Sequence, residues 1–272
     1  MNLRIITAII GVILFFCVLF APSAVFSAAV LLISCIAAYE IHRAVKANML
    51  LTIIGILTAI LIFLGIIAGN ILFAFVICFA VYPVLSVVLF NKCEVQKIYM
   101  LGFVSIVFSV SLSSLAVIRS EFSVAYTLLP FLFAWITDSG AYFFGIYLGK
   151  HKLVAHLSPK KTVEGSVGGI LMCMISALIY TWILDRFFDI QLFASSSYII
   201  MAVISAVASI ISQFGDLTLS AIKRNFNVKD YGKILPGHGG VLDRFDSLIF
   251  VAPFVYFALL FIQSVSSIIL VL

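Results

Sequence analysis

A charged stretch between residues 220 and 246 carries most of the side chains that could do chemistry in this chain. Asp243 and Asp246 lie three positions apart, so both carboxylates share one face if a helix begins near residue 241. With Asp216 they form an oxygen-rich set suited to Mg²⁺, which takes one or two protein carboxylates and completes its shell with water and phosphate oxygens. Basic side chains nearby would hold those phosphates. They are Lys223, Arg224 and Arg244.

A glycine-rich turn precedes these acids, with the sequence Pro236-Gly237-His238-Gly239-Gly240. Three glycines in four positions let the backbone approach a ligand closely and expose its N–H groups. His238 either contacts phosphate or orders the turn. The turn is not a Walker motif, because no Gly-Lys-Ser/Thr follows the glycines. Taken alone, the turn and its acids could also be a solvated loop with an Asp–Arg ion pair.

Polar residues recur at steps of three and four in the apolar run that precedes the turn. They are Ser209, Ser212, Gln213, Asp216, Ser220, Lys223 and Arg224. In a helix they form one stripe, which must face protein or water because lipid cannot satisfy it. Hydrogen bonding between helices would explain Ser209. It explains Asp216 poorly, since an isolated carboxylate in hydrocarbon is costly, so we expect Asp216 to be functional.

A third group of residues begins at Asp138, an acid in the middle of an apolar run and therefore a candidate for function. Further along, Ser158 can cap a helix whose first position is Pro159. That helix start, with Lys160 and Lys161 beside it, would attract an anion. The two lysines could equally be anchors on the inner side of a membrane, and the sequence leaves both interpretations open.

The elements that must position these residues are membrane helices. The chain has 272 residues, of which 64% are hydrophobic and 10% charged, and its mean hydropathy is +1.29. Soluble domains are nearer a quarter charged, so we expect an all-α, polytopic integral membrane protein. Apolar runs long enough to cross the bilayer predict about nine transmembrane helices. The runs are 5–21, 24–39, 51–68, 71–90, 99–118, 124–148, 166–184, 198–219 and 247–271. We interpret the first as a retained span, not a signal peptide.

The distribution of charge predicts the sidedness of the chain. If the N-terminus lies inside and every run crosses, almost all lysines and arginines fall on the inner side. The orientation of the chain in the membrane therefore explains its net charge of +5, and we expect no nucleic acid partner. We expect an N-terminal region of helices with little polar content (1–120) and a catalytic region (121–272) with inner loops at 149–165 and 220–246. His42-Arg43 and the loop from Lys92 to Lys97 are interpreted as interfacial anchors.

The pattern from Ser220 to Asp246 resembles the signature of the phosphatidate cytidylyltransferases, also called CDP-diacylglycerol synthases. The resemblance rests on Ser220-x-x-Lys223-Arg224, Lys229-Asp230-x-Gly232, Pro236-Gly237-His238-Gly239-Gly240 and Asp243-Arg244-x-Asp246. It extends to the segments starting at Asp138 and Ser158, and so covers the C-terminal half. Val163 departs from the pattern, because many relatives have Trp there.

The resemblance implies that CTP reacts with phosphatidic acid from the bilayer to give CDP-diacylglycerol and pyrophosphate. It also implies dependence on Mg²⁺, a homodimer, and a site in the cell inner membrane that faces the cytoplasm. Asp216, Asp243 and Asp246 would be the metal ligands, and a second, monovalent cation could share them. Phosphate groups would contact basic and polar side chains. These are Ser220, Lys223, Arg224, His238, Arg244 and Lys161, with Asp138 at the substrate site.

Three other classes of protein remain as alternatives. A secondary transporter also carries intramembrane acids, but its two halves would be inverted repeats, whereas these halves differ in polarity. A membrane scaffold would not need three acids and a glycine turn in one place. Phosphotransferases acting on lipid alcohols space their acids by four, and Asp243 and Asp246 are spaced by three.

Overall fold

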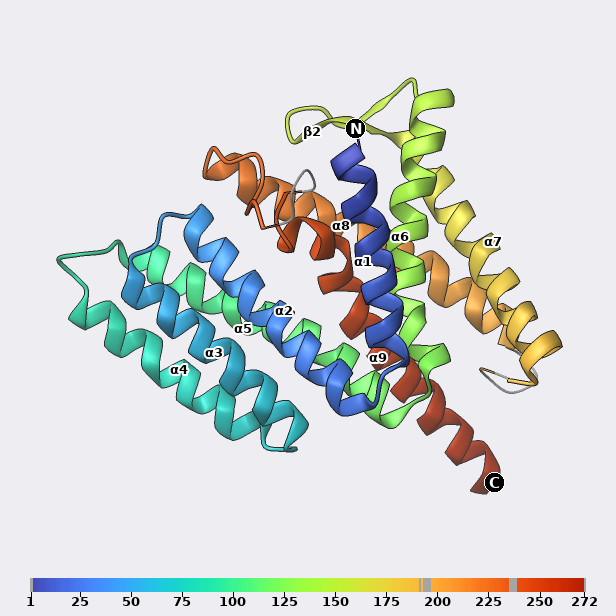
Figure 1. Ribbon diagram of the computed structural model, residues 1–272, viewed down its shortest axis with the longest axis horizontal. Helices are drawn as coiled ribbons and strands as arrows, with labels where there is room; N and C mark the ends of the chain where they lie inside the picture. Colours follow the sequence, from blue (N-terminus) through green and yellow to red (C-terminus); the bar gives the residue numbers. More distant parts are fainter. Residues whose placement is uncertain (1, 191, 193–196, 235–238, 272) are drawn as a thin grey trace. The chain divides into compact units, whose positions relative to one another are not determined.

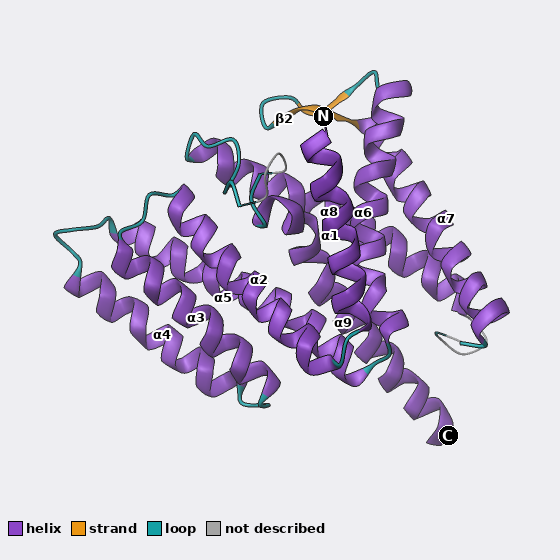
Figure 2. Cartoon of the chain, in the orientation of Figure 1, coloured by secondary structure: helices purple, strands orange, loops and turns teal. Residues whose placement is uncertain are grey.

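A computed structural model describes residues 2–190, 192, 197–234 and 239–271, and helices make up nearly all of this part of the chain (Figures 1 and 2). The helices are α1 (Asn2–Phe20), α2 (Ser23–Ala44), α3 (Met49–Ile67), α4 (Ile71–Val88), α5 (Val95–Glu121), α6 (Val124–Tyr147), α7 (Val163–Phe188), α8 (Ser197–Asn225) and α9 (Leu242–Val271). Eight helices in the described residues are long and apolar enough to cross a membrane. The predicted all-α, multi-span fold is confirmed.

Each predicted apolar run coincides with one helix, but most of the helices are longer than the runs. The run 99–118 lies within α5, which begins at Val95 and ends at Glu121. Hydropathy identifies the part of a helix that suits hydrocarbon, whereas the helix itself continues through polar residues at its ends. Local caps set some of the boundaries. The Asn48 side chain accepts a hydrogen bond of 2.8 Å from the Leu51 N–H and thereby starts α3.

Two compact units divide the described chain. The first comprises residues 1–121 and 225–245. Its central helix is α5, which contacts α2, α3 and α4 and is the most buried of the candidate spans. His42 in α2 is fully buried and shares a hydrogen bond of 2.9 Å with Ser105 in α5. The interpretation of His42 as an interfacial anchor is therefore wrong, because its imidazole lies inside the helix packing.

The second unit comprises residues 122–224 and 246–272. Helices α6 and α7 run side by side along most of their length (Figure 1). Glycines permit this close approach, as they do in many membrane helix pairs. A Cβ atom on Gly140 would lie 2.9 Å from the Met172 Cβ, and one on Gly169 would lie 2.9 Å from the Thr137 carbonyl oxygen. Helix α8 joins α6 through Thr137, whose hydroxyl donates to the Ser209 hydroxyl at 2.8 Å.

A two-stranded hairpin connects α6 to α7, with β1 (Lys152–Val154) antiparallel to β2 (Ser158–Thr162) (Figure 2). The predicted helix start at Ser158 and Pro159 is therefore wrong. Proline disfavours helical backbone in the residue before it, and this segment pairs as a strand instead. Helix α7 begins at Val163, where the Thr162 hydroxyl accepts a hydrogen bond of 3.1 Å from the Gly165 N–H.

The contact between α6 and α7 predicts that Gly169→Ala destabilises the protein. The added Cβ would meet a backbone oxygen, which cannot move aside as a flexible side chain can. Overpacking of this kind costs about 1–3 kcal/mol. We expect a lower midpoint of thermal unfolding for the purified protein in detergent.

Gly11→Ala is the matched control for this substitution. It also lies in a helix, and nothing lies within 4 Å of its added Cβ. Alanine there should leave the midpoint unchanged or raise it slightly, because glycine inside a helix costs about 0.5–1 kcal/mol. Equal midpoints for Gly169→Ala and the unmodified protein would show that α6 and α7 are not packed as described.

Candidate active site

A pocket of about 620 Å³ lies in the second unit, between the hairpin and helices α6, α7 and α8. The charged side chains that line it come from elements far apart in the sequence. They are Asp138 in α6, Lys152 in β1, Lys160 and Lys161 in β2, and Asp216 in α8. Three ammonium groups therefore surround two carboxylates in one cavity. Such a pocket suits an anionic ligand with several oxygens.

Asp216 and Lys161 form an ion pair that joins α8 to the hairpin. Both side chains are about a quarter exposed, so the pair is open to the pocket. One turn further along α8, the Ser220 hydroxyl donates to the Asp216 carboxylate at 3.4 Å. A carboxylate that carries a mobile lysine and a hydroxyl can exchange these partners for a ligand.

Gln213, one turn before Asp216 in α8, also faces protein. The Gln213 amide N–H donates to the Ser166 carbonyl oxygen at 3.2 Å, and the Ser166 hydroxyl donates back to the Gln213 amide oxygen. Both residues line the pocket. The predicted polar stripe is therefore confirmed as a protein-facing surface at Ser209, Gln213 and Asp216.

Two further carboxylates lie close to Asp216 in the second unit. The Ser247 hydroxyl in α9 donates to both oxygens of Asp138, at 3.2 and 3.4 Å. Asp246, the preceding residue in α9, interacts electrostatically with Asp216, Asp138 and Lys223. Three acids of like charge therefore share one region with the lysines of the pocket and with Lys223. A bound cation would relieve the repulsion among the carboxylates, and the lysines favour an anionic group beside it.

Asp243 has a different environment, within the first unit. It lies in the first turn of α9, and its carboxylate accepts hydrogen bonds from the backbone N–H groups of Tyr231 (2.9 Å) and Gly240 (3.0 Å). This side chain holds the loop before α9 in its fold. Its predicted role as a metal ligand stays a prediction.

The described structure thus places the predicted residues in different surroundings. Asp138, Lys161 and Asp216 line the pocket, Ser220 and Asp246 interact with its acids, and Lys223 interacts with Asp246. Arg224 is exposed at the end of α8, and Arg244 is exposed in the first unit. His238 lies outside the described residues.

Sequence reasoning missed several residues that shape this region. Glu164 accepts hydrogen bonds from the His151 ring (2.6 Å) and the Lys150 N–H (3.0 Å), and so ties the hairpin to α7. An acid in the first turn of a helix that follows a basic loop was the available signal. Glu40, in the first unit, was also missed, although an acid in an apolar helix is a candidate for function.

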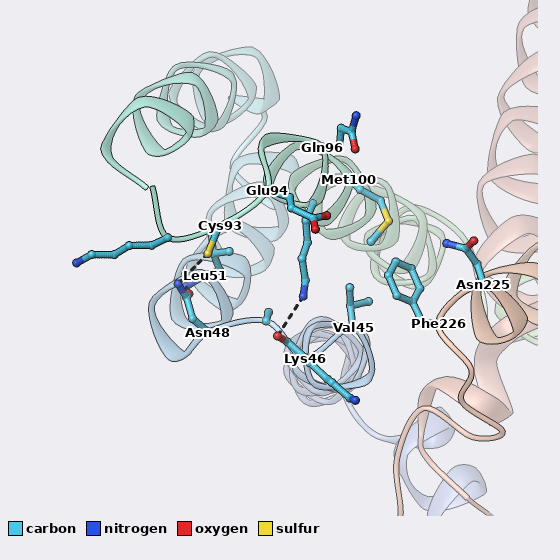
Figure 3. Close-up of a pocket in the computed structure, with 13 residues that line it drawn as sticks. Val45, Lys46, Asn48, Leu51, Cys93, Glu94, Gln96, Met100, Asn225 and Phe226 are labelled. Atoms are coloured by element: carbon cyan, nitrogen blue, oxygen red, sulfur yellow. Dashed lines mark hydrogen bonds between the residues drawn. The ribbon is translucent and has the colours of Figure 1, made fainter. Parts of the chain in front are cut away.

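A second pocket, of about 750 Å³, lies in the first unit at the ends of α2, α3, α5 and α8 (Figure 3). Its charged lining is Lys46, Lys92, Lys97 and Glu94. Lys97 donates to the Lys46 carbonyl oxygen at 3.1 Å. This pocket has one carboxylate in its lining, and it contains none of the predicted site residues. We therefore place the candidate site in the second unit.

The acids of the second unit are chemically suited to Mg²⁺, because that ion prefers hard oxygen ligands. Among the described residues, no group of three or more His, Cys, Asp or Glu could hold a metal ion by itself. Magnesium usually binds through one or two carboxylates and takes the rest of its shell from water and substrate phosphates. Asp216 and Asp246, which interact electrostatically, would supply that number of carboxylates.

The cytidylyltransferase family matches residues 2–262, which is nearly the whole chain. The chain belongs to this family. The resemblance inferred from residues 220–246 is therefore confirmed.

Curated relatives share a substantial part of the sequence. A phosphatidate cytidylyltransferase from Staphylococcus saprophyticus is 49% identical over 135 residues, which are 50% of this chain and 48% of the relative. One from Bacillus subtilis is 47% identical over 141 residues, or 51% and 49% of the two chains. One from Staphylococcus epidermidis is 47% identical over 135 residues, or 50% and 48%. The chain thus spans about half the length of the curated relatives it matches.

The hairpin leads to a prediction about the cap that starts α7 beside the pocket. Thr162→Val keeps the shape of the side chain but removes the hydroxyl that accepts from the Gly165 N–H. Loss of such a cap costs about 0.5–2 kcal/mol, so we expect a lower thermal midpoint. Thr162→Ser keeps the hydroxyl and should retain most of the stability. If Ser158→Ala destabilised the protein instead, the helix would start at Ser158.

Proposed function

We propose that the protein transfers the cytidylyl group of CTP to phosphatidic acid, giving CDP-diacylglycerol and pyrophosphate. Membership of the cytidylyltransferase family and the phosphatidate cytidylyltransferases among its relatives support this proposal. The observation that carries it is the pocket in the second unit, where Lys152, Lys160 and Lys161 surround Asp138 and Asp216. Lysines suit the triphosphate and the lipid phosphate, and carboxylates suit the cation that accompanies a nucleotide.

In the proposed reaction, a phosphate oxygen of phosphatidic acid attacks the α-phosphorus of CTP. A new P–O bond forms as the bond between the α-phosphorus and its bridging oxygen breaks, and pyrophosphate leaves with that electron pair. The nucleophile is already an anion, so the protein needs no strong general base. The main obstacle is the repulsion between two anions, and catalysis consists of positioning them and neutralising their charge.

The residues of the second unit have distinct roles in this proposal. Lys161, paired with Asp216, presents a positive charge in the pocket, and Lys160 and Lys152 add two more. Together they would orient the triphosphate and bring the lipid phosphate within reach. Asp138 is held by the Ser247 hydroxyl and would orient a polar group of the substrate.

Mg²⁺ would be held by Asp216 and Asp246, and when bound it would neutralise charge on the phosphate oxygens of CTP. Asp243 as a further ligand, and a second, monovalent cation, remain part of the proposal. So do the homodimer and the position of the site on the cytoplasmic side of the cell inner membrane. The excess of lysine and arginine in the loops assigned to the inner side supports that sidedness.

A cytidylyl-transfer assay tests the proposal directly. Purified protein would be given labelled CTP and phosphatidic acid, with and without Mg²⁺, and lipid-extractable CDP-diacylglycerol would be measured. We expect metal-dependent product, and we expect Asp216→Asn to lower kcat by at least about a hundredfold, since removing charge stabilisation of this kind costs 10²–10³ in rate.

Asp185→Asn is the matched control, because Asp185 is an exposed acid in the same unit and does not line the pocket. It should leave turnover unchanged. Absence of product from folded protein would overturn the proposed reaction. Equal turnover by Asp216→Asn and Asp185→Asn would remove Asp216 from the site and leave the reaction standing.

A further inference from the structure

Glu40 lies near the end of α2 in the first unit and is almost completely buried, with 1% of its surface exposed. A buried carboxylate is costly unless hydrogen bonds compensate for its lost hydration. Here those bonds come from a segment about two hundred residues further along the chain. The N–H groups of Val241 and Leu242 donate to the Glu40 carboxylate at 3.1 and 2.7 Å.

These two donors lie at the start of α9, which begins at Leu242. The first N–H groups of a helix have no partner within the helix, and a negative charge there is favourable. Glu40 therefore satisfies backbone groups that would otherwise be buried without partners. It fixes the point at which the loop ends and α9 begins.

Two glycines of the same loop pack directly against this carboxylate. The three atoms nearest to a Cβ built on Gly232 all belong to the Glu40 side chain. A Cβ on Gly240 would lie 2.6 Å from Glu40 Oε2. The backbone at Gly232 and Gly240 does not have the positive φ that favours glycine, which Gly239 does have, with φ of 86°. The side chain of Glu40 accounts for the absence of a Cβ at Gly232 and Gly240.

The same loop is held at a second point. The Gly240 N–H and the Tyr231 N–H both donate to the Asp243 carboxylate. The described part of the loop therefore folds around two carboxylates, one from α2 and one from α9. Glu40 is the one that does not belong to the stretch of residues 220–246.

We propose that Glu40 is a positioning residue for this loop and for the start of α9, which bears Asp243 and Arg244 and continues to Asp246. This inference rests on the proposed cytidylyl transfer for its consequence in catalysis. Glu40 itself acts only through the backbone it holds. Loss of its carboxylate would remove the hydrogen bonds to the Val241 and Leu242 N–H groups and would leave the packing of α2 unchanged.

Hydrogen exchange and steady-state kinetics on the full-length protein test this inference together. In Glu40→Gln, we expect exchange of the Val241 and Leu242 amides to become at least about tenfold faster, because the neutral amide keeps only one acceptor oxygen and accepts weaker hydrogen bonds than a carboxylate. We expect kcat to fall at least tenfold in the cytidylyl-transfer assay. Ser34→Ala is the control, since Ser34 is buried in the same helix and its hydroxyl has no hydrogen-bond partner among the described residues.

A double-mutant cycle identifies the contact itself and does not depend on Glu40→Gln folding well. Gly232→Ala alone should lower kcat and speed exchange, because its methyl group overlaps the Glu40 side chain. In a Glu40→Ala background the overlap is gone, so the same change should have little further effect. Additive effects of the two substitutions would overturn the inference.

The two proposals fail in different ways. If the unmodified protein makes CDP-diacylglycerol while Glu40→Gln matches it in both exchange and kcat, Glu40 is not a positioning residue and the reaction stands. Faster exchange with unchanged kcat also overturns the inference, because the loop would then be held without consequence for turnover. If the unmodified protein makes no product but exchange still rises in Glu40→Gln, the contact is real and the proposed reaction fails.

Discussion

The low polarity of membrane helices constrains the acids that lie within them, because a carboxylate among apolar side chains needs partners from the chain itself. In the second unit, Asp216 meets this need with Lys161 of the hairpin, which brings β2 against α8. Ser247 of α9 does the same for Asp138 of α6. These pairings connect elements far apart in the sequence, and they create the polar pocket in an otherwise apolar helix bundle.

Sequence periodicity was enough to identify the helices and the face of α8 that meets protein. Ser209, Gln213 and Asp216 recur at steps of three and four, and hydrocarbon cannot satisfy such a stripe, so its burial follows from simple geometry. Partners cannot be deduced in this way. Nothing local to α8 indicates that Lys161 would pair with Asp216, and the strand that carries Lys161 was predicted as a helix because Pro159 suits a first helical turn as well as a strand end.

The glycines near residue 240 show that close approach of the backbone can serve a contact within the protein. Their number predicts close approach of the backbone to another group, and the sequence suggested a bound ligand. For Gly240, the group that approaches most closely is the Glu40 carboxylate of the same chain. The sequence could not reveal this contact, because the two residues are two hundred positions apart. Glu40 also lies next to His42-Arg43, a segment that looks like the usual polar end of a membrane helix.

The acids differ in the kind of partner that satisfies them. Backbone N–H groups hold Glu40 and Asp243, and a ligand could replace those partners only if the loop unfolded. Side chains that can rotate away hold Asp216 and Asp138. Exchange of a lysine or a serine for a bound cation costs far less. Carboxylates held by mobile side chains are therefore the stronger candidates for contact with substrate, and those held by backbone set the shape in which that contact occurs.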